Sequence, residues 1–142
     1  MKTGSFFLLS IGFLLISLAC QAQSKVSQTK PYNDGVYTGQ SRSVYTSEPY
    51  WGKVTVSIEG GVIRNVSFQI RDSSLHETFN NDYAAHFKGN DLYIKQTMND
   101  WNGVKTYPKL LFEKQDIKKV DAMSGATWSY NIFKSAFSEA MK

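Results

Sequence analysis

Two alternating segments joined by a glycine pair constrain the fold of this 142-residue chain more than any other feature. Apolar and polar residues alternate from Trp51 to Glu59 and again from Val62 to Arg71, which is the pattern of strands with one buried face. Gly60-Gly61 between them is a two-residue turn signal. The pattern therefore predicts a β-hairpin whose apolar face carries Val54, Val56, Ile58, Val66, Phe68 and Ile70.

The C-terminal segment has the residue spacing of a helix. Apolar residues recur three and four positions apart after Thr127, which predicts an amphipathic helix with one buried side. The buried positions would be Trp128, Ile132, Phe133, Ala136, Phe137 and Ala140.

Weaker signals fill the rest of the chain. Gly35–Gly39 is expected to start a first strand, and Asn81–Phe87 and Leu92–Trp101 are expected to form short helices. Asn102-Gly103 would end the second of these, and Pro108 suits the first position of another helix. Ile117–Ala122 is expected to form a short strand. Together the segments predict an α+β domain, with a small antiparallel sheet built on an N-terminal β-hairpin and packed by helices, including the C-terminal amphipathic one.

The first 22 residues have the three parts of a secretory signal. Lys2 supplies the positive end, an apolar stretch follows from Phe6 to Ala19, and Ala22 suits the last position before cleavage. A lipoprotein signal is the alternative, with lipid attached to Cys20 after Ser17-Leu18-Ala19. We therefore expect an exported protein, periplasmic or at the cell surface, either released or lipid-anchored through Cys20. Residues 23–33 read as a polar linker and residues 34–142 as one domain.

The composition of the chain excludes several classes of functional site. Cys20 is the only cysteine of the chain, so a mature domain that begins after the signal contains no disulfide or thiol chemistry. His76 and His86 lack ligand-like spacing, so no metal site is expected. The formal net charge of +4 comes from dispersed basic residues, which does not indicate nucleic-acid binding.

Small residues and hydroxyls meet just before the terminal helix. Gly125 and Ala126 stand between Ser124 and Thr127, where backbone N–H groups of a first helical turn lack partners and can hold an anion. On spacing alone, helix capping is the commoner role of such a hydroxyl.

The run Asp-x-x-Ser-Gly-Ala-Thr-x-Ser, from Asp121 to Ser129, resembles the motif of the FMN-binding domain family, which includes flavin subunits of sodium-pumping and Rnf-type oxidoreductases. The family's opening, Asp-Gly-x-Tyr-x-Gly, is also matched from Asp34. In that family the second hydroxyl of the motif carries FMN through a phosphoester bond, and this hydroxyl corresponds to Thr127. The resemblance thus implies Ser124 as the helix N-cap and a cofactor-binding set of Thr127, Ser124, Gly125, Ala126, Asp121 and Trp128.

Asp121 would order the backbone of the motif or bind a metal needed during flavin attachment. Trp128 is the first candidate to stack on the flavin ring, ahead of Trp51, Trp101 and Tyr107. Glu77-Thr78 matches the start of a family turn that helps to position the flavin, but Phe79-Asn80 replaces the Pro-Gly of that turn.

The function implied by the resemblance is an exported FMN carrier that relays electrons between redox partners. A flavin transferase would install the FMN, and upstream and downstream electron-transfer proteins, some of them membrane-bound, would exchange electrons with it. The domain would then be an electron-transfer protein rather than an enzyme with its own substrate.

Two alternatives stay open. The first is a flavin-dependent reductase with loosely bound FMN, although the sequence contains no glycine-rich dinucleotide fingerprint. The second is a cofactor-free extracytoplasmic binding module that uses the aromatic residues between Tyr45 and Trp51.

Overall fold

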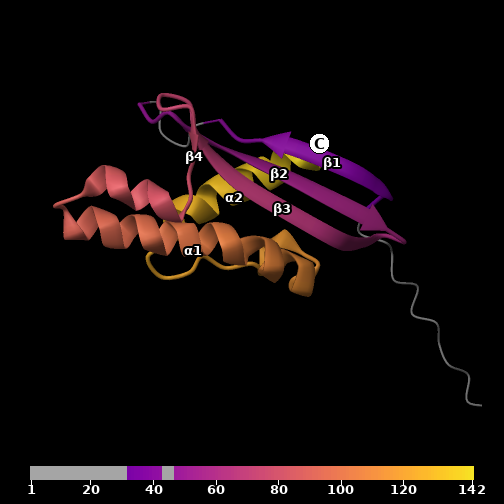
Figure 1. The fold of residues 1–142 in the computed structure, drawn as a ribbon. Helices are drawn as coiled ribbons and strands as arrows, with labels where there is room; N and C mark the ends of the chain where they lie inside the picture. The colour runs from indigo at the N-terminus through magenta and orange to yellow at the C-terminus, as the bar shows by residue number, and fades with distance from the viewer. Residues whose placement is uncertain (1–31, 43–46) are drawn as a thin grey trace, which may run out of the picture.

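A computed structural model describes residues 32–42 and 47–142. The predicted signal peptide with Cys20, and most of the predicted linker, lie outside these residues. The elements follow in the order β1 (Gly35–Gln40), β2 (Tyr50–Glu59), β3 (Val62–Asp72), β4 (Glu77–Thr78), the 3₁₀ helix η1 (Asn81–Phe87), α1 (Asp91–Lys114), the 3₁₀ helix η2 (Ile117–Lys119) and α2 (Thr127–Ala140) (Figure 1).

The four strands form one antiparallel sheet in the order β1-β2-β3-β4. The predicted hairpin is confirmed as β2 and β3, and its turn glycines have φ angles of +66° and +73°, as a two-residue hairpin turn requires. A bulge near Ser57 changes the register, so that Ile58 faces Ile63 and Arg64 stands outside the pairing. This extra residue turns Ile63 toward the core, which the alternation alone did not predict.

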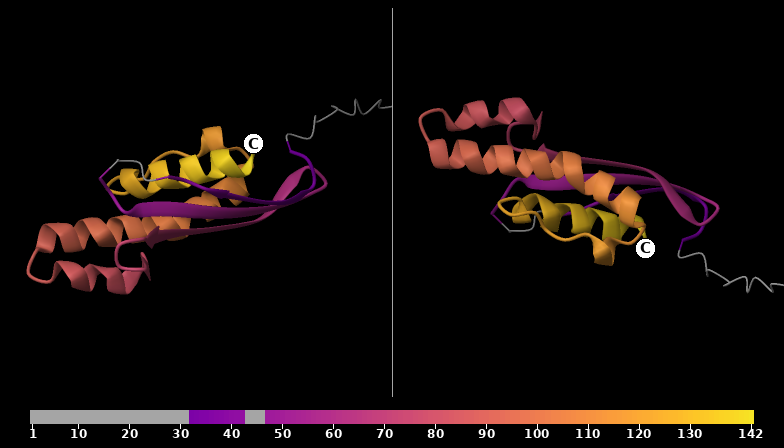
Figure 2. Two further views of the ribbon diagram at one scale, coloured as in Figure 1. Left: turned by 90° about the horizontal axis from the view of Figure 1, so that it is seen from above. Right: turned by 90° about the horizontal axis from the view of Figure 1, so that it is seen from below.

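Both long helices pack against the same face of the sheet. Helix α2 contacts β1 and β2, helix α1 contacts β3, and the two helices contact each other (Figures 1 and 2). The predicted α+β fold is confirmed, including the buried side of the terminal helix. The core beneath the helices contains Val54, Val56, Ile58, Ile63, Val104, Tyr107, Leu111, Ile132, Phe133, Ala136 and Phe137.

Helix α1 corrects two predictions. Asn102-Gly103 does not end a helix and Pro108 does not begin one, because both sites lie inside a continuous helix of 24 residues. An interior proline costs about 3 kcal/mol and a glycine about 1 kcal/mol relative to alanine. Burial of Val104, Tyr107 and Leu111 along one side outweighs that cost.

The predicted strand Ile117–Ala122 is also wrong. Residues 117–119 form η2, capped by the Asp116 carboxylate at the backbone N–H of Lys118 (2.9 Å), and residues 120–123 have no sheet partner. The short apolar run fits a 3₁₀ turn as well as a strand, because Val120 alone is fully buried.

A helical hairpin projects beyond the end of the sheet. It consists of η1, which was predicted as a short helix, and the first part of α1 (Figures 1 and 2). Asn80 and Asn90 cap the two helices, and Gly89 makes the turn between them with φ +90°. Within residues 32–42 and 47–142, we find no helix that combines the length and the apolarity needed to cross a membrane.

Candidate functional site

The motif forms a tight loop that leads into α2. Met123 accepts a hydrogen bond through its carbonyl from the N–H of Ala126 (3.0 Å), and Gly125 between them has φ +76°. The backbone angle therefore favours glycine, and a Cβ at this position would also displace the amide group of Asn99, which would lie 2.6 Å away.

The predicted N-cap is wrong. Ser124 lies exposed in the turn, and α2 begins three residues later with Ala126 at the N-cap position. Ala126 has no side chain that could accept a bond from the helix, so the first turn of α2 takes its cap from elsewhere.

Asp100 of helix α1 supplies that cap. Its carboxylate, which is 3% exposed, accepts hydrogen bonds from the backbone N–H of Ser129 (3.0 Å) and from the Ser129 hydroxyl (2.9 Å). Ser129 occupies the third helical position, the usual target of an N-cap side chain. Gln96 donates to the other Asp100 oxygen (2.6 Å) and to the carbonyl of Gly125 (2.9 Å). An acid from one helix therefore caps the start of the other.

Tyr107 fixes the other side of the loop. Its hydroxyl accepts a hydrogen bond from the N–H of Met123 (3.0 Å) and donates one to the carbonyl of Ala126 (2.9 Å). Burial raises the pKa of this phenol, so it stays protonated and able to donate. Its ring is fully buried and stacks on Phe133.

Close approach of the two helices makes these contacts possible. A Cβ at Gly103 would lie 2.5 Å from the Ser129 hydroxyl, 2.8 Å from the Tyr107 ring and 3.0 Å from the methyl group of Ala126. Only glycine leaves the room that the start of α2 occupies against α1.

Thr127 is the first residue of α2 and is exposed. Among the residues that the structure describes, its side chain has no hydrogen-bond partner, since it stands one residue past the N-cap and the capping bonds run from Ser129 to Asp100. The hydroxyl is therefore open to solvent and to chemical modification. Asp121 is also exposed, six positions earlier, and no described contact joins its carboxylate to Thr127.

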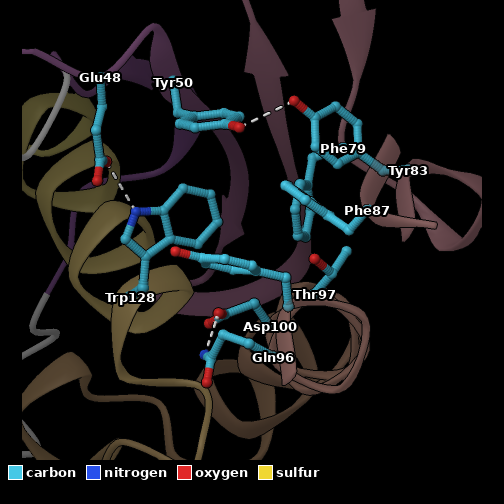
Figure 3. Close-up of a pocket in the computed structure, with 10 residues that line it drawn as sticks. Glu48, Tyr50, Phe79, Tyr83, Phe87, Gln96, Thr97, Asp100 and Trp128 are labelled. Atoms are coloured by element: carbon cyan, nitrogen blue, oxygen red, sulfur yellow. Dashed lines mark hydrogen bonds between the residues drawn. The ribbon is translucent and has the colours of Figure 1, made fainter. Parts of the chain in front are cut away.

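An aromatic pocket of about 360 Å³ adjoins the motif (Figure 3). It lies where the projecting helical hairpin meets the sheet and the start of α2. Trp128, directly after Thr127, forms part of the wall. The pocket is lined by Glu48, Tyr50, Phe79, Tyr83, Phe87, Tyr93, Gln96, Thr97, Asp100 and Trp128.

The indole of Trp128 is held in place from several sides. Its N–H donates to the Glu48 carboxylate (3.0 Å), and its ring lies edge-on to Tyr50 at 5.1 Å and tilted to Phe79 at 5.3 Å (Figure 3). Trp128 is thus only half-buried, in the pocket wall, whereas the other predicted buried positions of α2 are fully buried.

The other predicted ring contacts lie elsewhere. Tyr107 belongs to the core, and neither Trp51 nor Trp101 lines the aromatic pocket. Glu77 and Thr78 form β4, where Glu77 contacts His86 of η1 (2.8 Å) and Thr78 accepts a hydrogen bond from Arg71 of β3 (3.1 Å), and neither residue lines the aromatic pocket. Of the motif residues, Trp128 alone lines the pocket, and Thr127 is its neighbour in the sequence.

Sequence reasoning missed Asp100, Gly103 and Gln96. One signal was present: Asn99-Asp100-Trp101-Asn102-Gly103 is a run of poor helix formers. We interpreted that run as a helix end, whereas it is the part of α1 that packs against the start of α2.

Comparison with known proteins identifies the family. The sequence model of the FMN-binding domain matches residues 47–142, which is more than half of the chain. This chain belongs to the FMN-binding domain family. The match begins after β1, so the resemblance at Asp34 lies outside it, and it includes the whole motif and all residues of the aromatic pocket. Comparison with curated proteins gives no match.

A solved structure shares the fold. The CPE2226 protein of Clostridium perfringens superposes with a TM-score of 0.53 at 21% sequence identity, over 76% of this chain and 85% of that one. At this identity the likeness concerns the fold alone.

Proposed function

We propose that this FMN-binding domain carries FMN through a phosphoester bond to the Thr127 hydroxyl and relays electrons between redox partners. One observation carries the proposal. Thr127 stands exposed at the first position of α2, one residue past the N-cap, and Asp100 caps that helix through Ser129, so the threonine oxygen has no partner among the described residues.

The residues around Thr127 fit the phosphate. Gly125 and Ala126 carry little side chain, and the first-turn N–H groups of α2, apart from that of Ser129, which Asp100 already binds, favour a negative charge by about 0.3–1 kcal/mol at an exposed site. An interaction of that size orients the phosphate but does not retain it. A covalent bond is the means of retention for a protein that works where free FMN is scarce.

The aromatic pocket fits the flavin ring. Its walls are mainly aromatic, and one wall residue, Trp128, directly follows Thr127, the residue that would hold the phosphate. FMN when bound supplies one- and two-electron redox chemistry. The chain supplies placement: Asp100 and Tyr107 hold the loop, and Trp128, Tyr50 and Phe79 hold the wall.

Export belongs to the same proposal. The amino-terminal signal would bring the domain to the periplasm or the cell surface, free or lipid-anchored at Cys20, where a flavin transferase and electron-transfer proteins would meet it. A relay needs no substrate pocket beyond the flavin site, and the absence of a dinucleotide fingerprint from the sequence agrees with that role.

Coexpression with a flavin transferase tests the proposal. The wild-type protein should gain the mass of FMN less one water and keep flavin fluorescence on a denaturing gel. Thr127→Ala should remove both signals, Thr127→Ser should retain part of them, and Ser124→Ala serves as the matched control with flavin attached. An unmodified mass in the wild-type protein, or flavin retained by Thr127→Ala, would refute the attachment site.

The reductase alternative keeps one supporting observation. The pocket does not depend on an ester to receive a ring, because its walls come from five segments of the fold. Flavin that is released by denaturation, together with oxidation of a nicotinamide donor by the purified protein, would favour that alternative.

A further inference from the structure

Two tyrosines and an aspartate form a hydrogen-bonded chain along one wall of the aromatic pocket. The Tyr50 and Tyr83 hydroxyl oxygens lie 2.9 Å apart, and the Tyr83 hydroxyl lies 2.5 Å from a carboxylate oxygen of Asp72. Figure 3 shows the two hydroxyls pointing toward each other. Asp72 and Tyr83 are buried, whereas Tyr50 is half-buried and borders the pocket.

Asp72 fixes the direction of this chain. Burial by itself raises the pKa of this carboxyl, but hydrogen bonds from Ser74, Tyr83 and the N–H of Leu75 outweigh burial and hold the pKa below its ordinary value. An ionised carboxylate only accepts hydrogen bonds. Tyr83 must therefore donate its single proton to Asp72.

The same reasoning assigns the second proton. Burial and the bond to Asp72 raise the pKa of Tyr83, so its phenol stays protonated with its hydrogen engaged. Between the two hydroxyls, Tyr50 is then the donor and Tyr83 the acceptor. Each phenol has one hydrogen, and both are used within the chain. The Tyr50 oxygen has only lone pairs left for a ligand.

We propose that Tyr50 is a specificity-determining residue, an acceptor-only group that selects a planar ring with an N–H donor at its rim, and that Tyr83 and Asp72 are positioning residues which set its proton. The other charged groups that line the pocket, Glu48 and Asp100, are also hydrogen-bond acceptors, although Glu48 already accepts from the Trp128 N–H and Asp100 from Ser129 and Gln96. The inference rests on the proposed function, since it takes the ring to be isoalloxazine. The oxidised isoalloxazine ring has one N–H group, at N3.

Riboflavin and 3-methylriboflavin provide the test. They differ in the N3 hydrogen, and neither has a phosphate, so binding is independent of attachment at Thr127. Titration of the full-length protein, followed by quenching of flavin fluorescence, gives the ratio of the two dissociation constants. We expect riboflavin to bind about two- to tenfold more tightly to the wild-type protein, the range of one net hydrogen bond.

The variants separate hydrogen bonding from the bulk of the methyl group. Tyr50→Phe should bring the ratio close to one, and Tyr83→Phe should lower it because the Tyr50 proton is then free to face the ligand. Phe87→Leu, which changes the pocket wall without a polar atom, should weaken both ligands equally and keep the ratio. Thermal melting of each variant verifies the fold.

An unchanged ratio in Tyr50→Phe would overturn the inference, because the methyl group would then be rejected by its bulk. An unchanged ratio in Tyr83→Phe would overturn the assignment of the protons, and equal binding of both flavins to the wild-type protein would overturn the selection itself. Repeating the titration in Thr127→Ala keeps the two proposals apart. Loss of flavin attachment with an intact ratio concerns Thr127 alone, and an altered ratio with intact attachment concerns Tyr50 alone.

Discussion

Replacement of Asp100 by alanine tests whether one helix caps the other. The side chain accepts three hydrogen bonds, from the Ser129 N–H, the Ser129 hydroxyl and the Gln96 amide. Ser129 is fully buried, so Asp100→Ala leaves two of its donors without water and without their carboxylate partner. Loss of a helix cap costs about 1 kcal/mol, and an unsatisfied buried donor costs about 1–3 kcal/mol.

The Ser129 hydroxyl keeps a second acceptor, the carbonyl of Ala126 at 3.1 Å, so the two penalties do not add fully. We expect Asp100→Ala to lower the free energy of unfolding by about 2–4 kcal/mol. Asp100→Asn keeps the shape and one acceptor oxygen, and it should cost less. Its amide cannot accept from both Ser129 and Gln96, however, so some loss remains.

Urea unfolding followed by circular dichroism at the helix band measures these differences. Glu113→Ala is the control, because this exposed acid on the same helix has no described partner and should change stability by less than about 0.5 kcal/mol. Flavin attachment in Asp100→Ala should also fall, since the start of α2 would loosen. If Asp100→Ala were as stable as Glu113→Ala, the capping argument would be wrong.

Three further predictions concern the same fold. Gly103→Ala should cost about 1–3 kcal/mol in urea unfolding, because its methyl group would lie 2.5 Å from the Ser129 hydroxyl, and a cost near zero would contradict the close approach. Tyr107→Phe should lower both stability, by about 1–2 kcal/mol, and the rate of flavin attachment, measured by gel fluorescence, because the motif loop loses a donor and an acceptor. The stabilisation from Asp72 should be complete above the ordinary pKa of its carboxyl, 3.8, and should be lost as the pH falls through the lower pKa of the folded state. Tyr83→Phe removes one donor to this carboxylate, so acid unfolding of the variant, followed by circular dichroism, should begin at a higher pH than in the wild type.

The hairpin and the terminal helix could be predicted because their signals are local. Alternation around Gly60-Gly61 and the three-four spacing after Trp128 depend only on which side of one element is buried. The same local rules failed at α1. Asp100 and Gly103 are poor residues for an isolated helix, and they are there because α2 meets α1 at this point.

The candidate site also contains residues that local sequence could predict and residues that only tertiary contacts bring together. Thr127 could be found from the order of neighbouring residues in the motif, whereas Ser124 was wrongly predicted as cap because the true cap comes from a segment 29 positions away from its partner Ser129. The pocket joins Tyr50, Tyr83 and Trp128 from three distant segments. No spacing rule within one segment predicts such a group.

Helix α2 rests on glycine at both ends. Near its start it lies against Gly103, and near its end the backbone of Ala136 and Ala140 lies so close to Gly39 that a Cβ there would be 2.2 Å from both. These close approaches oppose sliding or rolling of α2 against α1 at its start and against β1 near its end. The backbone at Thr127 would consequently keep a fixed place relative to the sheet, so a group tethered there would move only through the rotatable bonds of its own tether and through rotation of the whole domain.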